Sequence, residues 1–237
     1  MRTQTLELPT ADGLMPTYEA IPDEPPRAAV IVIQEAYGVN DYIERVARDL
    51  AAAGYHAVAP NLFHRTECLT VDYGDMKRAI EMIQTLTDES ELTDVDAAIA
   101  HLRAAGFDDK RIGIVGFCMG GRVTFLACAR RAIGAGVGFY GGAIVTGWPP
   151  KLASLIGEAD SMKAPWLGLF GDNDQSIPVE HVEQLRDALK AAPVETEIVR
   201  YPNAGHGFHS EPRPQSYVPE AAADAWRRTL DWFGRLL

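Results

Sequence analysis

Short, almost wholly apolar runs recur along this chain of 237 residues, and they constrain its fold more than any other feature. The run at 28–33, Ala-Ala-Val-Ile-Val-Ile, is apolar at every position. A strand with one solvated face would alternate apolar and polar residues, so this run predicts a strand covered on both faces, as in a parallel sheet. Similar runs occur at 56–59, 112–115, 136–139, 166–170 and 197–201.

Helical patterns separate these apolar runs. Residues 41–53 repeat apolar side chains at helical spacing and stop at Gly54, and residues 91–105 do the same before Gly106. Further helices are expected at 74–86, 119–131, 179–191 and 219–236. Repeated strand–helix–strand units predict an α/β fold, with a mostly parallel, doubly wound sheet and helices on both of its faces.

The N-terminal residues show a different pattern. Residues 3–8 alternate polar and apolar side chains, which predicts a half-exposed edge strand, and Asp12-Gly13 is a turn signal before a partner strand at 15–20. No internal repeat, low-complexity tract or polar linker divides the chain. We therefore expect a single domain over residues 1–237.

Charge and cysteine content disfavour several classes of protein. Lys and Arg number 22 against 33 Asp and Glu, so the net charge of −11 argues against a nucleic-acid partner, whose phosphates require clustered basic residues. Three cysteines are too few for a disulfide scaffold and indicate a reducing compartment. With no signal peptide and no apolar run near the roughly 20 residues of a membrane helix, we expect a cytoplasmic protein without membrane contact.

The clearest chemical signal is Gly116-Phe-Cys-Met-Gly120, between a predicted buried strand and a predicted helix. It is a G-x-C-x-G version of the nucleophile elbow, in which the nucleophile occupies a sharp turn and larger residues at the two glycine positions would collide with it. The following helix would direct its positive dipole end toward the sulfur of Cys118. The alternative is a cysteine buried in the core.

Two later segments support the catalytic interpretation. Phe170-Gly-Asp-Asn-Asp-Gln-Ser-Ile-Pro178 follows one apolar run, and Tyr201-Pro-Asn-Ala-Gly-His-Gly-Phe208 follows the next. They offer Asp174 and His206 in the order nucleophile, acid, histidine, each just after a strand, where open α/β sheets place their sites. Asp172 is the other candidate acid, although it is also a typical turn residue.

At this level the sequence resembles the dienelactone hydrolase family, the cysteine-dependent branch of the α/β hydrolases, from about Asp12 to His209. The motifs that carry the resemblance are Gln34-Glu-Ala-Tyr-Gly-Val-Asn40, Gly54-Tyr-His-Ala-Val-Ala-Pro-Asn-Leu-Phe63, Gly116-Phe-Cys-Met-Gly-Gly121, Asp174 with Pro178, and Ala204-Gly-His-Gly-Phe208. The resemblance implies an α/β-hydrolase fold and a hydrolase of lactones or carboxylic esters.

The resemblance also assigns roles to particular residues. It implies Cys118 as nucleophile, His206 as base and Asp174 as the carboxylate that orients the histidine. It further implies that Glu35 lies beside the thiol and controls when the thiolate forms, whereas Glu35 considered alone could cap the helix that begins near Asp41. In this fold the oxyanion hole uses the backbone N–H groups of Met119 and Ala36.

The substrate-binding residues are less constrained by sequence. The family's arginines bind a substrate carboxylate, and Arg213 and Arg78 are the candidates here, with solvated surface charge as the alternative for both. Tyr37, Phe63 and Tyr140 are candidates for the pocket walls, or for the core. The net charge of −11 gives an anionic substrate no long-range attraction.

Alternative functions have weaker support. Gly136-Val-Gly-Phe-Tyr-Gly141 matches a dinucleotide-binding pattern, with Asp160 about 20 residues later, but its glycines fall inside a predicted strand. His206 and His209 lack the helical spacing of zinc hydrolases. We expect no metal and no cofactor, and a monomer or small homo-oligomer that acts on a small lactone or ester. A general small-ester carboxylesterase and a non-catalytic binding protein of the same fold are the alternatives.

Overall fold

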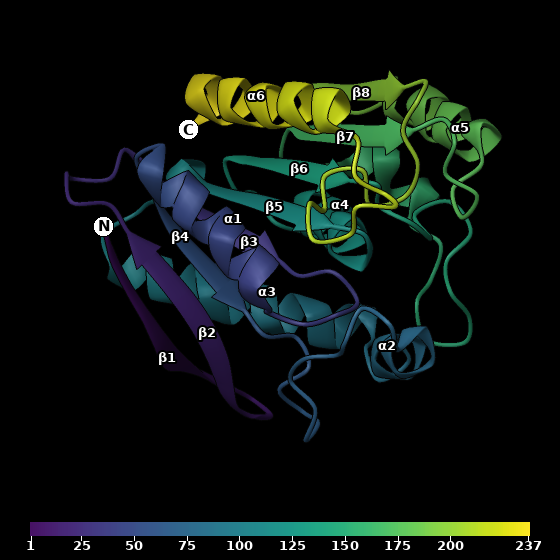
Figure 1. Cartoon of the computed structure of the whole chain (residues 1–237). Coiled ribbons are helices and arrows are strands. Elements are labelled where there is room, and N and C mark those ends of the chain that lie inside the picture. The colour runs from purple at the N-terminus through teal and green to yellow at the C-terminus, as the bar shows by residue number, and fades with distance from the viewer.

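The computed structural model describes residues 1–237, and its eight strands form one sheet in the order β1-β2-β4-β3-β5-β6-β7-β8 (Figure 1). The strands are β1 (Arg2–Thr10), β2 (Gly13–Ile21), β3 (Ala28–Ile33), β4 (Tyr55–Pro60), β5 (Ile112–Phe117), β6 (Ala135–Phe139), β7 (Trp166–Gly171) and β8 (Thr196–Tyr201). Strand β2 pairs antiparallel with both β1 and β4, and every other neighbouring pair is parallel. The predicted mostly parallel α/β sheet is confirmed.

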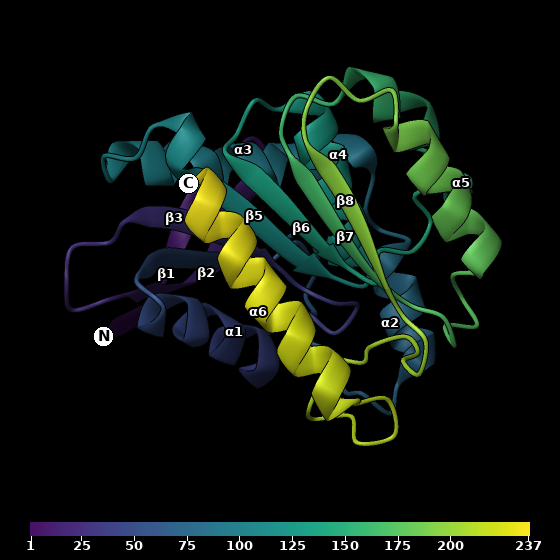
Figure 2. The ribbon, with the colours of Figure 1, turned by 90° about the horizontal axis from the view of Figure 1, so that it is seen from above.

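Six α-helices connect and cover these strands. They are α1 (Asp41–Ala52), α2 (Met76–Ile83), α3 (Asp88–Ala104), α4 (Met119–Arg130), α5 (Val179–Leu189) and α6 (Pro219–Leu236). Seen from above in Figure 2, α1 and α6 cross the near face of the sheet, while α3 and α4 lie behind it. None of the helices combines the length and apolar character that a membrane span requires.

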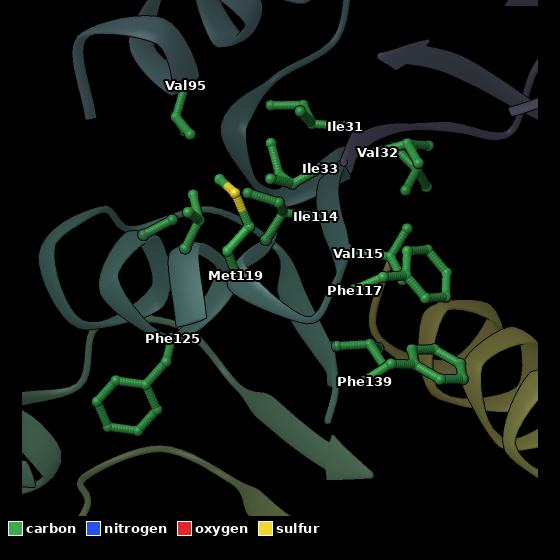
Figure 3. Packing of buried hydrophobic residues seen from close by; sticks show 14 of the residues in the cluster. Ile31, Val32, Ile33, Val95, Ile114, Val115, Phe117, Met119, Phe125 and Phe139 are labelled. Atoms are coloured by element: carbon green, nitrogen blue, oxygen red, sulfur yellow. The ribbon is translucent and has the colours of Figure 1, made fainter. Parts of the chain in front are cut away.

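Five of the apolar runs form strands that are buried on both faces, as predicted, whereas the run at 197–201 forms the edge strand β8, in which only Ile198 is buried. Every residue of β3, β4 and β5 is buried. Figure 3 shows how side chains of neighbouring positions diverge: Ile33 and Ile114 point toward Met119 at the start of α4, whereas Phe117 points to the opposite face, toward α6. Period-2 alternation therefore supplies apolar contacts to both helical layers from one strand.

The N-terminal hairpin is longer than predicted. Its strands pair from Arg2 with Ile21 to Thr10 with Gly13, so it extends beyond the expected 3–8 and 15–20. Gly13 has a φ of 129°, which a residue with a side chain rarely adopts. The predicted turn signal is thus placed correctly, and β1 is the edge strand of the sheet.

Two helix starts differ from the sequence prediction. Helix α3 begins at Asp88 rather than 91, because Thr87 and Ser90 cap it reciprocally through side-chain and backbone groups. Helix α2 begins after Asp75, whose carboxylate accepts a hydrogen bond from the Arg78 N–H, and it covers only part of the predicted 74–86.

The first two glycines of the dinucleotide-like pattern lie inside the sheet, and the third, Gly141, follows β6. Gly136 and Gly138 belong to β6, and a Cβ at Gly136 would lie 2.3 Å from the Sγ of Cys128. These glycines allow close packing of β6 against α4, and they do not begin a helix as a dinucleotide site would require.

Candidate active site

Cys118 lies in the turn between β5 and α4. Its φ of 56° is unusual for a residue with a side chain, and this strained turn holds it between the strand and the helix. A Cβ at Gly116 would lie 2.1 Å from the Gly120 carbonyl oxygen, and one at Gly120 would lie 2.6 Å from the carbonyl oxygens of Ile33 and Gln34. Both glycines of the motif are therefore required by backbone contacts.

Helix α4 begins directly after Cys118, which is its N-cap residue but makes no capping hydrogen bond through its side chain. The thiol therefore does not cap the helix. The positive end of the helix dipole lies at this position, and it favours a negative charge on sulfur.

Asp174 and His206 come together from the loops that follow β7 and β8. The Nδ1 of His206 lies 2.7 Å from the Asp174 Oδ2. The other carboxylate oxygen, Oδ1, accepts hydrogen bonds from the backbone N–H and the hydroxyl of Ser176, at 2.8 and 2.6 Å. Asp172 instead accepts a hydrogen bond from Arg200 at 2.7 Å, so the structure associates Asp174, and not Asp172, with the histidine.

The electrostatic environment of His206 favours its protonated form. Burial by itself would lower the pKa of His206, but the facing Cys118 sulfur and the hydrogen bond that His206 donates to Asp174 outweigh burial and raise that pKa to about 10. Burial would likewise raise the pKa of Asp174, but its hydrogen bond to His206 outweighs that effect and lowers it. The three side chains form a coupled charge system.

Glu35 follows β3 and is buried in the same region. Its Oε1 accepts a hydrogen bond from the Nη2 of Arg213 at 2.8 Å and a longer one from the Tyr140 hydroxyl at 3.4 Å, while its Oε2 is buried without a partner. Burial raises the pKa of Glu35, and the Arg213 guanidinium opposes this rise. Glu35 does not cap α1, because Asn40 performs that role through its side chain.

Two backbone N–H groups near Cys118 make no hydrogen bond to the protein. Ala36 lies in the loop after β3, and its N–H has no acceptor among the backbone or side-chain groups. Met119 is the first residue of α4, where helical N–H groups lack an intrahelical acceptor. Both residues line the cavity that contains Cys118.

These groups surround one cavity with a volume of about 650 Å³. Glu35, Cys118, Asp174 and His206 line it, together with Arg213. Its apolar wall comes from α2 and from the segment after β6, and consists of Met76, Ile83, Ala143, Trp148 and Leu152.

Arg213 is buried rather than solvated, which corrects the surface-charge alternative for this residue. Its side chain is 10% exposed, and its guanidinium lies 5.6 and 5.7 Å from the ring centres of Tyr37 and Tyr73. A Cβ at Gly207 would collide with the Arg213 guanidinium, so the lack of a side chain at Gly207 leaves the space that the arginine occupies. Tyr37 lines the cavity as expected from the sequence.

The structure does not bring two other expected substrate-binding residues to the cavity. Phe63 is fully buried in the core, because the loop after β4 directs its side chain inward. Arg78 lies on the exposed side of α2, where it forms an ion pair with Glu81 at 3.2 Å. Tyr140 is also buried outside the lining; it contacts the site through its hydroxyl, 3.4 Å from Glu35, and through its ring, whose centre is 5.2 Å from that of His206.

Sequence reasoning missed a second charged group in the cavity wall. Arg122 is almost completely buried and donates hydrogen bonds to Glu91 at 3.2 Å and to the Ala153 carbonyl oxygen at 2.7 Å. It also forms an ion pair with Asp88 at 2.7 Å. Burial raises the pKa of Glu91 to about 8. The available signal was a lone arginine in the otherwise uncharged stretch from 112 to 129.

His209 belongs to the core beside the site. Its Nδ1 is 2.8 Å from the Tyr42 hydroxyl, and burial lowers the pKa of its imidazole to about 4. It packs against Phe117 and Trp226, whereas His206 faces Asp174. The two histidines therefore have separate partners.

Comparison with known proteins agrees with this geometry. The model of the dienelactone hydrolase family matches residues 15–237. A protein of Methylorubrum extorquens with the provisional name carboxymethylenebutenolidase is 38% identical over 231 residues, which cover 96% of this chain and 79% of that protein. A Bradyrhizobium protein, provisionally named a 2-oxo-3-(5-oxofuran-2-ylidene)propanoate lactonase, is 35% identical over 204 residues, covering 85% of this chain and 81% of that one.

A solved structure is similar over nearly the whole chain. The crystal structure of a provisionally named dienelactone hydrolase from Klebsiella pneumoniae has a TM-score of 0.90 and 36% sequence identity, and the match covers 98% of each chain. The fold of this chain is thus shared with that structure along nearly its full length.

Proposed function

The chain belongs to the dienelactone hydrolase family of carboxylic ester hydrolases, and we propose that it cleaves a lactone or ester through a thioester on Cys118. Cys118, Asp174 and His206 line the same cavity, and Cys118 occupies a strained turn at the start of a helix. This arrangement supports the proposal. A nucleophile, a base and a group that orients the base are the parts that covalent acyl transfer requires.

The first half of the reaction forms the acyl-enzyme. The Cys118 thiolate attacks the carbonyl carbon, and the negative charge that develops on the carbonyl oxygen is stabilised by the N–H groups of Ala36 and Met119. As the tetrahedral intermediate collapses, the C–O bond breaks and the protonated His206 gives its proton to the departing alkoxide. A lactone opens in this step, and its alcohol stays attached to the acyl group.

The second half releases the product. His206, now neutral, takes a proton from a water molecule, and the resulting hydroxide attacks the thioester carbonyl. The intermediate expels the Cys118 thiolate, which returns to its place opposite the imidazolium. Asp174 keeps Nδ1 of His206 protonated, so that Nε2 is the atom that exchanges protons with the reactants.

Arg213 favours a substrate that carries a carboxylate near the scissile bond. It is the cation that lines the cavity beside Glu35, and a guanidinium binds a carboxylate through two parallel hydrogen bonds. The Bradyrhizobium relative is named for a lactone that bears a propanoate group, which has this combination of ring ester and carboxylate.

Glu35 would couple substrate binding to thiol activation. In the free protein Arg213 holds the Glu35 carboxylate and opposes the effect of burial on its pKa. When a substrate carboxylate takes the guanidinium, Glu35 loses this stabilisation and becomes a stronger base. It can then accept the proton of any Cys118 sulfur that is still a thiol, so the fraction present as thiolate rises when substrate is bound.

A small neutral ester is the second candidate substrate. The apolar wall that includes Met76 and Trp148 suits a hydrophobic acyl or aryl group without a charge. A thiol nucleophile requires a reducing compartment in either case, and we propose the cytoplasm.

The test compares Cys118→Ala with Cys68→Ser, a control at a free cysteine outside the cavity. Hydrolysis of cis- and trans-dienelactone and of p-nitrophenyl acetate is measured for both. We expect Cys118→Ala to lose at least about 10³-fold in kcat on the preferred substrate, since the covalent route is removed. Cys68→Ser should stay within twofold of the unaltered protein. Undiminished turnover by Cys118→Ala would refute the proposed mechanism.

A further inference from the structure

A cluster of Glu19, His56 and His101 lies on the antiparallel side of the sheet, outside the proposed catalytic site. Glu19 is on β2, His56 on β4 and His101 in the last turn of α3. Glu19 pairs with Val58 in the β2–β4 register, so His56, two residues away, shares its face of the sheet. Helix α3 covers this face, and it brings His101 onto the other two residues.

The cluster is separate from the cavity of Cys118. His56 pairs with Ala29 in the parallel β3–β4 register, whereas Glu35 follows the other end of β3, six residues further along. At about 3.3 Å per residue along β3, the two sites are roughly 20 Å apart, at opposite ends of the parallel strands. None of the three residues lines the cavity.

Two imidazoles converge on one carboxylate oxygen. The Nε2 atoms of His56 and His101 each lie 2.8 Å from the Oε1 of Glu19. The two rings are almost perpendicular, with an interplanar angle of 88°. Gln4 donates to the other carboxylate oxygen at 2.6 Å, which fixes the orientation of the Glu19 side chain.

The cluster is shielded yet accessible from one side. The side chains of Glu19 and His56 are 3% and 7% exposed, whereas that of His101 is 26% exposed. The first two residues are held by neighbouring strands, and His101 leaves a path from solvent. Two of the three side chains are thus held rigidly, and the cluster is open to water on one side.

We propose that Glu19, His56 and His101 bind one divalent transition-metal ion, with Zn²⁺ as the best match. Two imidazole nitrogens and a carboxylate oxygen are a donor set that suits zinc and its first-row neighbours. The donor atoms of the three residues lie within 4.8 Å of one another. A tetrahedral ion with ligands at about 2.0–2.1 Å needs them roughly 3.3 Å apart, so small side-chain adjustments are sufficient.

Binding would exchange hydrogen bonds for metal bonds. Each histidine would carry its proton on Nδ1, leaving the Nε2 lone pair for the ion, and Glu19 would ligate through Oε1. Water arriving past His101 would complete the coordination. Because the ligands come from β2, β4 and α3, the ion would tie this helix to the N-terminal strands, and its role would be structural rather than catalytic.

The experiment measures Zn²⁺ binding by isothermal titration calorimetry, and Co²⁺ binding by its visible absorption spectrum. Both are carried out in a Cys118→Ser background, because the cavity thiol is itself a possible metal ligand. His101→Gln removes a partly exposed ligand and should leave the fold intact, which circular dichroism checks. His181→Gln, on α5 and outside the cluster, is the matched control.

We expect one equivalent of Zn²⁺ to bind and to raise the melting temperature, with His181→Gln unchanged. The His101→Gln variant should bind at least tenfold more weakly and should lose the tetrahedral Co²⁺ spectrum. No saturable binding, or equal binding by His101→Gln, would refute the metal site. The cluster would then serve only to hydrogen-bond α3 to the strands. Because hydrolysis is not the readout, failure here does not affect the proposed function, and failure of the proposed function does not affect this test.

Discussion

At the scale of single residues, the environment of Cys118 depends on Gly116 and Gly120, because the lack of a side chain at these positions lets backbone segments approach closely. The carbonyl groups of Ile33 and Gln34 lie where a side chain at Gly120 would begin, so β3 and the start of α4 are in backbone contact. This contact fixes the distance between the loop that carries Ala36 and the start of α4, where Met119 lies. The proposed oxyanion hole therefore depends on a glycine that does not itself touch the substrate.

The substitution Gly120→Ala tests this dependence. Its methyl group would lie 2.6 Å from two backbone oxygens, so the strand and the helix must separate. We expect a loss of about 1–3 kcal/mol in the free energy of unfolding, measured by urea denaturation, together with reduced esterase activity. Gly234→Ala, on α6 with no atom within 4 Å of the new Cβ, should instead stabilise by about 0.5–1 kcal/mol. A Gly120→Ala variant as stable as the unaltered protein would contradict the contact.

Arg213 is the residue at which substrate preference can be tested. Arg213→Met should lower kcat/KM for dienelactone about 100-fold, because a charged hydrogen bond to the substrate carboxylate is worth about 1.5–3 kcal/mol. Hydrolysis of neutral p-nitrophenyl acetate should fall less than about tenfold. Arg78→Met is the control, since that side chain is 46% exposed and outside the cavity, and it should leave both rates unchanged. An equal loss on both substrates would assign Arg213 to positioning Glu35 alone.

At the scale of secondary-structure elements, α3 and α4 are joined by a buried charge network. Arg122 on α4 reaches Asp88 and Glu91 in the first turn of α3. Burial raises the pKa of Glu91 to about 8, so this carboxyl group is largely neutral at pH 7 and Asp88 supplies most of the opposing charge. The network also lies in the cavity wall, where it fixes the helix that follows Cys118.

Substitutions in this network should have unequal effects. Arg122→Met leaves Asp88 without its counter-ion and the Ala153 carbonyl without its donor, and we expect it to cost about 3 kcal/mol or more in urea unfolding at pH 7. Glu91→Gln replaces a neutral acid by a neutral amide, and it should cost less than about 1 kcal/mol. If Glu91→Gln proved as damaging as Arg122→Met, the carboxyl group would have to be ionised in the folded protein.

The elements themselves were largely predictable from sequence, for reasons visible in particular segments. The run at 28–33 is apolar throughout because β3 is covered on both faces, and α6 was predicted at 219–236, the bounds it has. The start of α3 was missed because its cap uses Ser90 in place of the Glu or Gln of the usual capping signal. Serine is also common in loops, so Ser90 did not mark the start of this helix in the sequence.

The candidate site was predictable where local sequence signals exist: a cysteine flanked by glycines, and an aspartate and a histidine that each follow a predicted strand. Gly116 and Gly120 are readable because each would collide with backbone if it carried a side chain. Phe63 was wrongly expected at the cavity, because a position after a strand does not reveal which way a side chain points. The burial of Arg213 depends on a contact with Glu35 across 178 positions of sequence, which no local pattern encodes.

At the scale of the whole molecule, the site is assembled from loops that are distant in sequence and meet at one edge of the sheet. Segments after β3, β5, β7 and β8 contribute Glu35, Cys118, Asp174 and His206, and their strands are parallel. Parallel strands bring their carboxyl ends to the same edge, which is why the fold concentrates polar groups there. The stability of the molecule is therefore coupled to the protonation of this site.

This coupling predicts a specific pH dependence. The pKa of His206 is raised to about 10 in the folded protein, above its unfolded value of about 6.5. The folded state thus binds the proton more tightly, and the stability gained from the imidazolium is complete below about pH 6.5 and lost as the pH rises toward 10.

Urea denaturation at a series of pH values checks this prediction. Between pH 6.5 and 10, the free energy of unfolding should fall more steeply for the unaltered protein than for His206→Gln. Cys118→Ala should also flatten the profile, because the charge of the sulfur contributes to the raised pKa of His206. Parallel profiles for all three proteins would show that the histidine titrates normally.

Peptide mass spectrometry after rapid acid quenching during ester turnover shows whether the acyl group passes through the sulfur of Cys118. We expect a substrate-derived acyl mass on the peptide that contains Cys118, which hydroxylamine removes. The peptides with Cys68 and Cys128 should remain unmodified. Turnover with an acyl adduct on another residue, and none on Cys118, would refute the proposed thioester.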